Sequence, residues 1–344
     1  EPDLPAVATG SHIDAIPNAG KFDGVVGVLG GLEAVRSLKE SGCELRRSIE
    51  IVMFTAEEPT RFGLGCLGSR LMGGALAPDE AESLTDADGR TLADLRAGAG
   101  CEGGLESVRL AEGAYAGFVE LHIEQGPILE REEVAIGAVE KIAAPAAFRV
   151  RIEGEGGHAG ALLMPVRKDA GCAAAEVVLA VERAAKGTSS DDTVGTTGVL
   201  RLEPGAINSV PVRAVVEIDL RDTSLATRDA AEAEIRAALD EIAERRGVEV
   251  KVETINSDEP AICDAGLVDA ITRVAKSEGV ASMRLISRAY HDSLFMARVC
   301  PTAMIFIPCR GGWSHRPDEF ASHEAIEAGV RVLAGVLRER AACA

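Results

Sequence analysis

Imidazole and carboxylate side chains gather in this chain at the ends of short apolar runs that are typical of strands. The residues concerned are His12, Asp23, Glu58, His122 and His315. Three imidazoles with two carboxylates form a donor set that suits Zn²⁺, Mn²⁺ or Co²⁺. A carboxylate that bridges two such ions about 3.5–4 Å apart makes a co-catalytic pair. We therefore expect Asp23 to bridge two ions, with His12 and His122 on one ion and Glu58 and His315 on the other.

Each of these motifs, taken alone, also has a structural explanation. Asp23 precedes a helical segment and could serve as its N-cap, and a lone histidine is more often a satisfied core residue. The adjacent acids Glu57 and Glu58 could belong to a surface loop, although they follow a buried strand. In a metal site one of them would bind an ion while its neighbour accepts a proton. Asp14 stands two residues after His12, and we expect its side chain to hold the far nitrogen of that imidazole.

Two patterns of secondary structure divide the chain. Up to residue 143 apolar strands alternate with helical segments, and the same alternation returns at residue 262. This alternation predicts an α/β domain on a mostly parallel sheet, whose sites lie at the carboxyl ends of strands. Residues 144–261 instead carry about four strand-like runs and two long helices, typical of an α+β unit. We expect a catalytic domain of residues 1–143 and 262–344, interrupted by a lid and dimerisation domain of residues 144–261.

Composition and charge limit the classes of partner. The 344 residues include 47% hydrophobic residues, enough for a sizeable core, and the net charge of −19 disfavours nucleic acid and anionic membranes. No apolar run is long enough to insert across a bilayer, and no signal peptide is evident. The eight cysteines are scattered, which favours buried thiols over a disulfide scaffold. Because the chain starts at Glu1 without Met and soon enters a strand, we expect a natural N-terminal portion to be missing.

A series of motifs resembles one known family along nearly the whole chain. They are GSHID, FDGVVGV, FTAEEPTRFG, LHIEQGP, GGHAGA, GAINSVP, DLRD and HDSLFMA, in the family's order. They resemble the amidase/carbamoylase branch of the dinuclear, M20-like metallopeptidase superfamily. This branch includes allantoate amidohydrolases, N-carbamoyl-amino-acid hydrolases, β-ureidopropionases and ureidoglycolate amidohydrolases. The chain is most similar to the plant and green-algal type of the last group, apart from the family's N-terminal portion, which it lacks.

The resemblance implies a reaction, a cofactor and an assembly. Two divalent ions, Mn²⁺ by expectation with Zn²⁺ or Co²⁺ as alternatives, would activate water for attack on a ureido carbonyl. Glu57 would be the general base, and His158 would stabilise the oxyanion from the lid of the partner in a homodimer. The implied activity is hydrolysis of (S)-ureidoglycolate, a small anionic ureido substrate, to glyoxylate, ammonia and carbon dioxide in purine catabolism.

The resemblance also implies substrate contacts in addition to His158. The candidates are Gln125, Asn208, Arg221, Tyr290 and His291. From the residues alone, Asn208 is equally well explained as a turn residue, and Arg221 as an ion pair with Asp219 or Asp222. Only the resemblance favours an Arg221 grip on a substrate carboxylate. By the resemblance, Tyr290 distinguishes ureidoglycolate amidohydrolases from their relatives. Relatives that act on allantoate or carbamoyl amino acids tend to carry a small residue at this position.

Several alternatives stay open at the level of sequence. Allantoate or an N-carbamoyl-L-amino acid is the nearest rival substrate, and a dipeptidase or a non-catalytic binding homologue is a more distant rival. The complete ligand set with Glu57 argues against a binding homologue, and the HIEQG and EEPTRFG motifs lean away from a dipeptidase. The plant relatives suggest the endoplasmic reticulum, with the cytoplasm as the alternative location.

Overall fold

Two units account for the fold, and each has its own sheet. The computed structural model describes residues 3–342. One unit contains the residues up to Ile142 together with those from Ala261 onward, and the other is Ala143–Pro260. We call them the catalytic unit and the inserted unit. Their boundaries differ by one residue from those that the change of pattern predicts.

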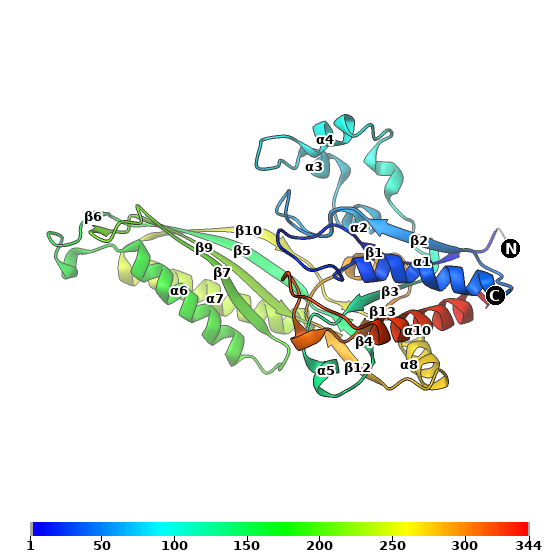
Figure 1. The fold of residues 1–344 in the computed structure, drawn as a ribbon. Coiled ribbons are helices and arrows are strands. Elements are labelled where there is room, and N and C mark those ends of the chain that lie inside the picture. The colour runs from blue at the N-terminus through cyan, green and yellow to red at the C-terminus, as the bar shows by residue number, and fades with distance from the viewer. Residues whose placement is uncertain (1–2, 343–344) are drawn as a thin grey trace. The chain divides into compact units, whose positions relative to one another are not determined.

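A mainly parallel sheet forms the centre of the catalytic unit (Figure 1). Its strand order is β11-β4-β13-β3-β1-β2, and β12 pairs with β4. The strands are β1 (Ala6–His12), β2 (Ile49–Phe54), β3 (Tyr115–Ile123), β4 (Ile136–Ile142), β11 (Ala261–Ile262), β12 (Ser282–Ser287) and β13 (Thr302–Ile307). Because β2, β1, β3 and β13 are parallel neighbours, their carboxyl ends meet at one edge of the sheet. The following loops therefore start close together.

Helices cover both faces of this sheet, as the alternating pattern predicts. On one face α1 (Val25–Glu40), α8 (Ala265–Ser277) and α10 (His323–Ala342) pack together, whereas α2 (Leu67–Met72) and α9 (Asp292–Met296) lie on the other face. The remaining helical segments of this unit are α3 (Pro78–Ser83), α4 (Leu92–Gly98), η1 (Leu105–Val108), α5 (Ile128–Arg131) and η3 (Arg310–Gly312). A Cβ at Gly27 of α1 would lie 2.4 Å from the carbonyl oxygen of Leu121, so glycine lets α1 pack directly on β3.

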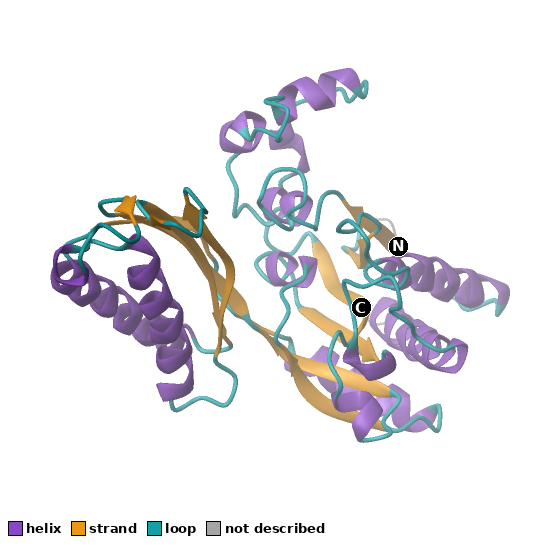
Figure 2. Cartoon of the chain, turned by 60° about the vertical axis from the view of Figure 1, so that its left-hand side comes forward, coloured by secondary structure: helices purple, strands orange, loops and turns teal. Residues whose placement is uncertain are grey.

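The inserted unit is an antiparallel sheet with two long helices on one face (Figure 2). Its sheet order is β10-β5-β9-β7. The elements are β5 (Ala144–Glu153), β6 (Gly157–His158), η2 (Met164–Val166), α6 (Ala170–Gly187), β7 (Val194–Glu203), β8 (Ser209–Val210), β9 (Arg213–Asp222), α7 (Leu225–Arg246) and β10 (Glu249–Ser257). Alternate residues of β5 and β9 join the helices in one apolar core. The expected α/β class with an inserted α+β unit is confirmed.

No helix within residues 3–342 is long and apolar enough to cross a membrane.

Candidate metal centre

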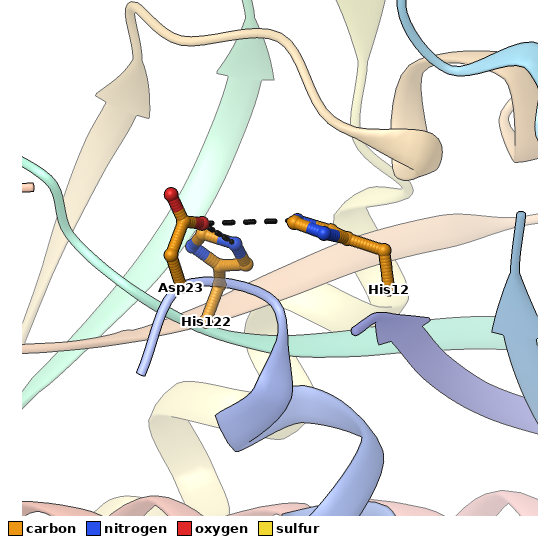
Figure 3. Close-up of side chains that lie close together, drawn as sticks. All are labelled: His12, Asp23 and His122. Carbon is orange, nitrogen blue, oxygen red and sulfur yellow. Dashed lines mark ion pairs between the residues drawn. The ribbon is translucent and has the colours of Figure 1, made fainter. Parts of the chain in front are cut away.

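Two histidines from adjacent parallel strands face one aspartate. His12 ends β1 and His122 lies one residue before the end of β3, while Asp23 lies in the loop that leads into α1. Figure 3 shows Asp23 beside both imidazoles. Its Oδ1 is 3.1 Å from Nε2 of His122 and 3.7 Å from Nε2 of His12. All three side chains are buried. The cap position of α1 falls on Gly24 without a side-chain cap bond, so a capping role for Asp23 is wrong.

The second oxygen of Asp23 faces a different pair of residues. Asp23 Oδ2 is 3.1 Å from Nε2 of His315, and the same nitrogen is 3.3 Å from Oε1 of Glu58. We name His12, His122 and Asp23 the first ligand group, and Asp23, Glu58 and His315 the second ligand group. Ligands about 2.0–2.2 Å from a tetrahedral ion stand about 3.3–3.6 Å apart. The separations of 3.1–3.7 Å in both groups therefore fit two divalent ions that share Asp23.

Main-chain carbonyls orient both buried imidazoles. Nδ1 of His12 lies 2.9 Å from the carbonyl oxygen of Asp14, and Nδ1 of His122 lies 2.8 Å from that of Ile123. A carbonyl only accepts, so these contacts favour a proton on each Nδ1 and leave Nε2 for an ion. The expectation that the Asp14 side chain holds His12 is wrong, because its nearer oxygen is 3.8 Å away. That carboxylate instead accepts from the backbone amide of Glu58 at 3.1 Å and so orients the acidic loop.

Strong ion pairing inside the groups raises the basicity of two histidines in the metal-free chain. Burial alone would lower the pKa of His122, but the hydrogen bond and attraction to Asp23 outweigh it and raise that pKa to about 9. Hydrogen bonds to Asp23 and Glu58 raise the pKa of His315 to about 10. Burial acts to raise the pKa of Asp23, yet its bonds to His122 and His315 bring that pKa far below the usual range. A bound ion would replace the imidazolium protons as the partner of these carboxylates.

Glu57 lies beside the ligands and belongs to neither group. Its Oε1 accepts a hydrogen bond from the thiol of Cys66 at 3.3 Å, and its Oε2 is 3.7 Å from Nε2 of His12. Burial first, and then the charges of Asp292 and Glu58, raise the pKa of Glu57 well above that of an ordinary carboxyl. A buried carboxylate that points one oxygen at the ligands has the position that a general base needs.

Three further predicted residues lie around the ligand groups. The side-chain amide of Gln125 donates to Asp23 Oδ2 at 3.0 Å, so it contacts the bridging carboxylate itself. The ring of His291 is buried and meets the ring of His122 edge to face, with 4.5 Å between centroids. The hydroxyl of Tyr290 fits against Gly65, where an added Cβ would lie only 2.0 Å from it. The missing side chain of Gly65 therefore leaves a gap, which we call the notch at Gly65. The hydroxyl of Tyr290 occupies this gap, beside the loop that carries Glu57.

Two buried carboxyls near this site were missed in the sequence. Glu120 is fully buried and accepts hydrogen bonds from the hydroxyls of Ser11, at 2.7 Å, and Ser293, at 2.6 Å. Asp292 is also fully buried and accepts from Ser69. The two-residue period of a strand places Glu120 on the same face as His122, and that alternation could have identified it. Asp292 stands inside the HDSLFMA motif, but nothing in its spacing indicates burial.

The inserted unit brings two of its predicted residues together and holds the third apart. His158 and Asn208 are exposed neighbours, because the backbone amide of Ala159 donates to the carbonyl of Asn208 at 2.9 Å. Arg221 is the penultimate residue of β9. It lies eight residues beyond Arg213, the first residue of that strand, which corresponds to about 26 Å. Its guanidinium bonds both oxygens of Asp219, at 2.8 and 2.7 Å. This is the ion pair that the residues alone favour.

Comparisons with known proteins agree with this geometry. The model of peptidase family M20/M25/M40 matches residues 8–339. A ureidoglycolate hydrolase of Arabidopsis thaliana is 51% identical over 340 residues, which cover 97% of this chain and 71% of that protein. That of Oryza sativa subsp. japonica is 53% identical over 342 residues, which cover 97% and 70% of the two chains. Crystal structures of AtUAH with glyoxylate and with (S)-hydroxyglycine superpose with a TM-score of 0.92 at 50% identity, and the match covers 99% of this chain and 82% of theirs. The chain belongs to peptidase family M20/M25/M40.

Proposed function

We propose that the chain hydrolyses the carbon–nitrogen bond of (S)-ureidoglycolate, which yields glyoxylate, ammonia and carbon dioxide. The observation that carries this proposal is a complete set of ligand groups and an adjacent buried carboxylate in a chain 51% identical to a plant ureidoglycolate hydrolase. The glyoxylate and (S)-hydroxyglycine bound to AtUAH are chemically the product and the product's precursor in such a reaction. They support a small carboxylate-bearing substrate.

Two divalent ions would be held by the two ligand groups, with Asp23 between them. When bound, such ions polarise a carbonyl and lower the pKa of a coordinated water toward neutrality. Mixed imidazole and carboxylate ligands suit Mn²⁺, Zn²⁺ and Co²⁺ alike. We propose Mn²⁺ from the resemblance to the plant enzymes.

Glu57 would carry the proton in this reaction. Its Oε1 is held by the Cys66 thiol, so Oε2, the oxygen nearer His12, is the one directed at the ligand groups. At that oxygen Glu57 would accept the proton of the attacking water and later return it to the departing nitrogen. The raised pKa of Glu57 in the metal-free chain suits a group that must both accept and release a proton.

We further propose that the inserted unit acts as a lid in a homodimer. His158 and Asn208 are exposed and lie at β6 and just before β8, which both precede β9, whereas Arg221 lies eight residues, about 26 Å, beyond the first residue of β9. One ureidoglycolate molecule is too small to touch both places. A second copy that supplies His158 and Asn208 would resolve this separation, with His158 stabilising the oxyanion. Arg221 would then exchange Asp219 for the substrate carboxylate, since both present two acceptor oxygens.

Tyr290 is the feature that favours ureidoglycolate over a larger ureido substrate. Its hydroxyl is seated in the notch at Gly65, so the aromatic ring takes up space beside the loop of Glu57. Allantoate carries a second ureido group and would need that space.

For location we propose the endoplasmic reticulum, again from the resemblance to plant relatives.

The test is a side-by-side measurement of ammonia and glyoxylate release with Mn²⁺. Ureidoglycolate, allantoate and an N-carbamoyl-L-amino acid are compared at equal concentrations, and the same sample treated with a chelator is the control. We expect kcat/KM for ureidoglycolate to exceed the others by about tenfold or more. Preference for another ureido compound would overturn the substrate while keeping the two-ion chemistry. Activity that survives complete metal removal, or activity on a dipeptide alone, would overturn the proposed chemistry.

A further inference from the structure

We propose that Glu319 is a positioning residue that ties the bridging ligand Asp23 to the loop of His315, so that the second ion depends on it. Glu319 is buried, yet it is in neither ligand group and the proposed mechanism does not use it. The inference rests on the two-ion centre of the proposed function, but not on the identity of the substrate.

One carboxylate oxygen of Glu319 holds the loop that carries Asp23. Oε1 accepts hydrogen bonds from the backbone amides of Phe22, at 2.8 Å, and Asp23, at 3.1 Å. Gly20 leaves room for this contact, because a Cβ there would lie 2.3 Å from the Glu319 side chain. Bonds from two successive amides to one charged oxygen restrict the backbone immediately before the shared ligand.

The other oxygen of Glu319 holds the loop that carries His315. Oε2 accepts from the hydroxyl of Ser314 at 2.8 Å, and this hydroxyl also lies 3.1 Å from Asp23 Oδ2. The amide of Gln125 completes the network, at 3.2 Å from the Ser314 oxygen. Glu319 therefore connects two loops that are almost 300 residues apart in the sequence and that both supply ligands to the second group.

The two ligand groups differ in how firmly the fold supports them. In the first group the imidazoles of His12 and His122 project from neighbouring strands and are buried. In the second group His315 comes from a loop, has a φ of 58° and keeps 47% of its side chain exposed. A backbone in the left-handed region and an exposed ring need support from their surroundings to stay in place. Asp23 belongs to both groups, whereas His315 belongs only to the second. Removing Glu319 should accordingly weaken the second ion more than the first.

The test measures Mn²⁺ binding without substrate. Glu319→Ala removes both contacts, Glu319→Gln retains an oxygen for the two amides, and Glu327→Gln on the exposed side of α10 is the matched control. Calorimetric titration of the intact metal-free chain gives stoichiometry and affinity. Trp313 is the only tryptophan in the sequence and precedes Ser314, so its fluorescence reports on the same loop. Circular dichroism in the presence of chelator verifies folding of each variant.

We expect Glu319→Ala to bind the second Mn²⁺ about 10–100-fold more weakly, the usual effect of losing the support of a ligand. The first ion shares Asp23 but not His315, so it should lose less affinity than the second. Glu319→Gln should keep most of the second affinity. Because Ser314→Ala removes only one of the two links, it should give an intermediate loss and provides a milder variant if Glu319→Ala misfolds.

Several outcomes would overturn the inference. Two unaltered sites in Glu319→Ala would show that the carboxylate positions nothing. Equal weakening of both ions in a folded variant would show that Glu319 has no particular role at the second ligand group. A Gln variant as impaired as the Ala variant would assign the effect to charge. An unsubstituted chain that binds fewer than two ions would overturn the two-ion centre itself, a failure distinguishable from the other three.

Discussion

The sharpest consequence of the geometry concerns Glu57→Gln. Glutamine keeps the size of the side chain and one oxygen that can accept from the Cys66 thiol at 3.3 Å. It removes the negative charge and the ability to take a proton. Because Glu57 belongs to neither ligand group, the change should leave both ions in place. The variant thus separates the proton-transfer step from metal binding.

The size of the expected loss in kcat depends on whether another group could accept the proton in place of Glu57. Glu58 is engaged in the second ligand group, and Asp292 is fully buried and bonded to Ser69. Bulk water has little access either, since Glu57 is only 8% exposed. A positioned general base contributes about 10²–10⁴-fold in rate, which is about 2.7–5.4 kcal/mol. With no substitute at hand, we expect a loss of kcat in the upper half of that range.

Initial rates of ammonia and glyoxylate release should be measured on samples whose metal content is determined by mass spectrometry. Glu327→Gln, an exposed substitution on α10, is the control for the change from acid to amide. We expect two ions per chain and a KM within about threefold of the unsubstituted chain. A kcat within tenfold of the unsubstituted chain, with both ions bound, would refute the role of base. Loss of an ion would instead make Glu57 a ligand.

Other predictions follow from the same contacts. The pKa values of His122 and His315 are raised to about 9 and about 10, so both rings are positively charged imidazolium at pH 7 in the metal-free chain. Ion binding should therefore release about two protons, one from each ring, and should weaken as pH falls. Calorimetry in buffers of different ionisation enthalpy measures this release, and its absence would contradict the assigned pairs. Glu120→Leu would leave the donors of its buried hydrogen bonds unsatisfied and should lower the free energy of unfolding by about 3–5 kcal/mol. Urea unfolding of the metal-free chain tests it, and a loss below about 1 kcal/mol would show that the site relaxes around the change. Gly65→Ala should displace the hydroxyl of Tyr290, since the new methyl would lie 2.0 Å from it. In protein labelled with 3-fluorotyrosine, one ¹⁹F resonance should move while that of the only other tyrosine stays, and two unchanged resonances would refute the contact.

The alternation of apolar strands and helices was sufficient to predict the class of fold. Residues up to His12 and up to Ile123 each form a strand that ends at the same edge of the sheet, because parallel neighbours share their direction. The same rule predicts that His12, His122 and the acids after β2 lie close together. The ligand set depended on side-chain type and on strand direction, and both can be identified in a sequence.

Contacts between loops could not be predicted in this way. Asp14 stands beside His12 in sequence, yet its carboxylate accepts from the amide of Glu58 and only its carbonyl meets the imidazole. Whether a side chain or its own backbone makes a contact depends on dihedral angles that no spacing rule specifies. The choice of Arg221 between Asp219 and a substrate is likewise a matter of packing and competition, not of residue type.

Periodicity and residue type by themselves were sufficient to predict the parallel sheet, the inserted unit and a central place for Asp23 among the candidate ligands. Only the tertiary structure decided that Glu319 joins the loops of Asp23 and His315, that Gly65 seats Tyr290, and that Glu120 lies beneath the ligands. The physical reason is the distance in sequence between the residues that make contact. A strand or helix is specified by neighbours within a few residues, whereas these contacts join segments that meet only after the whole catalytic unit has packed.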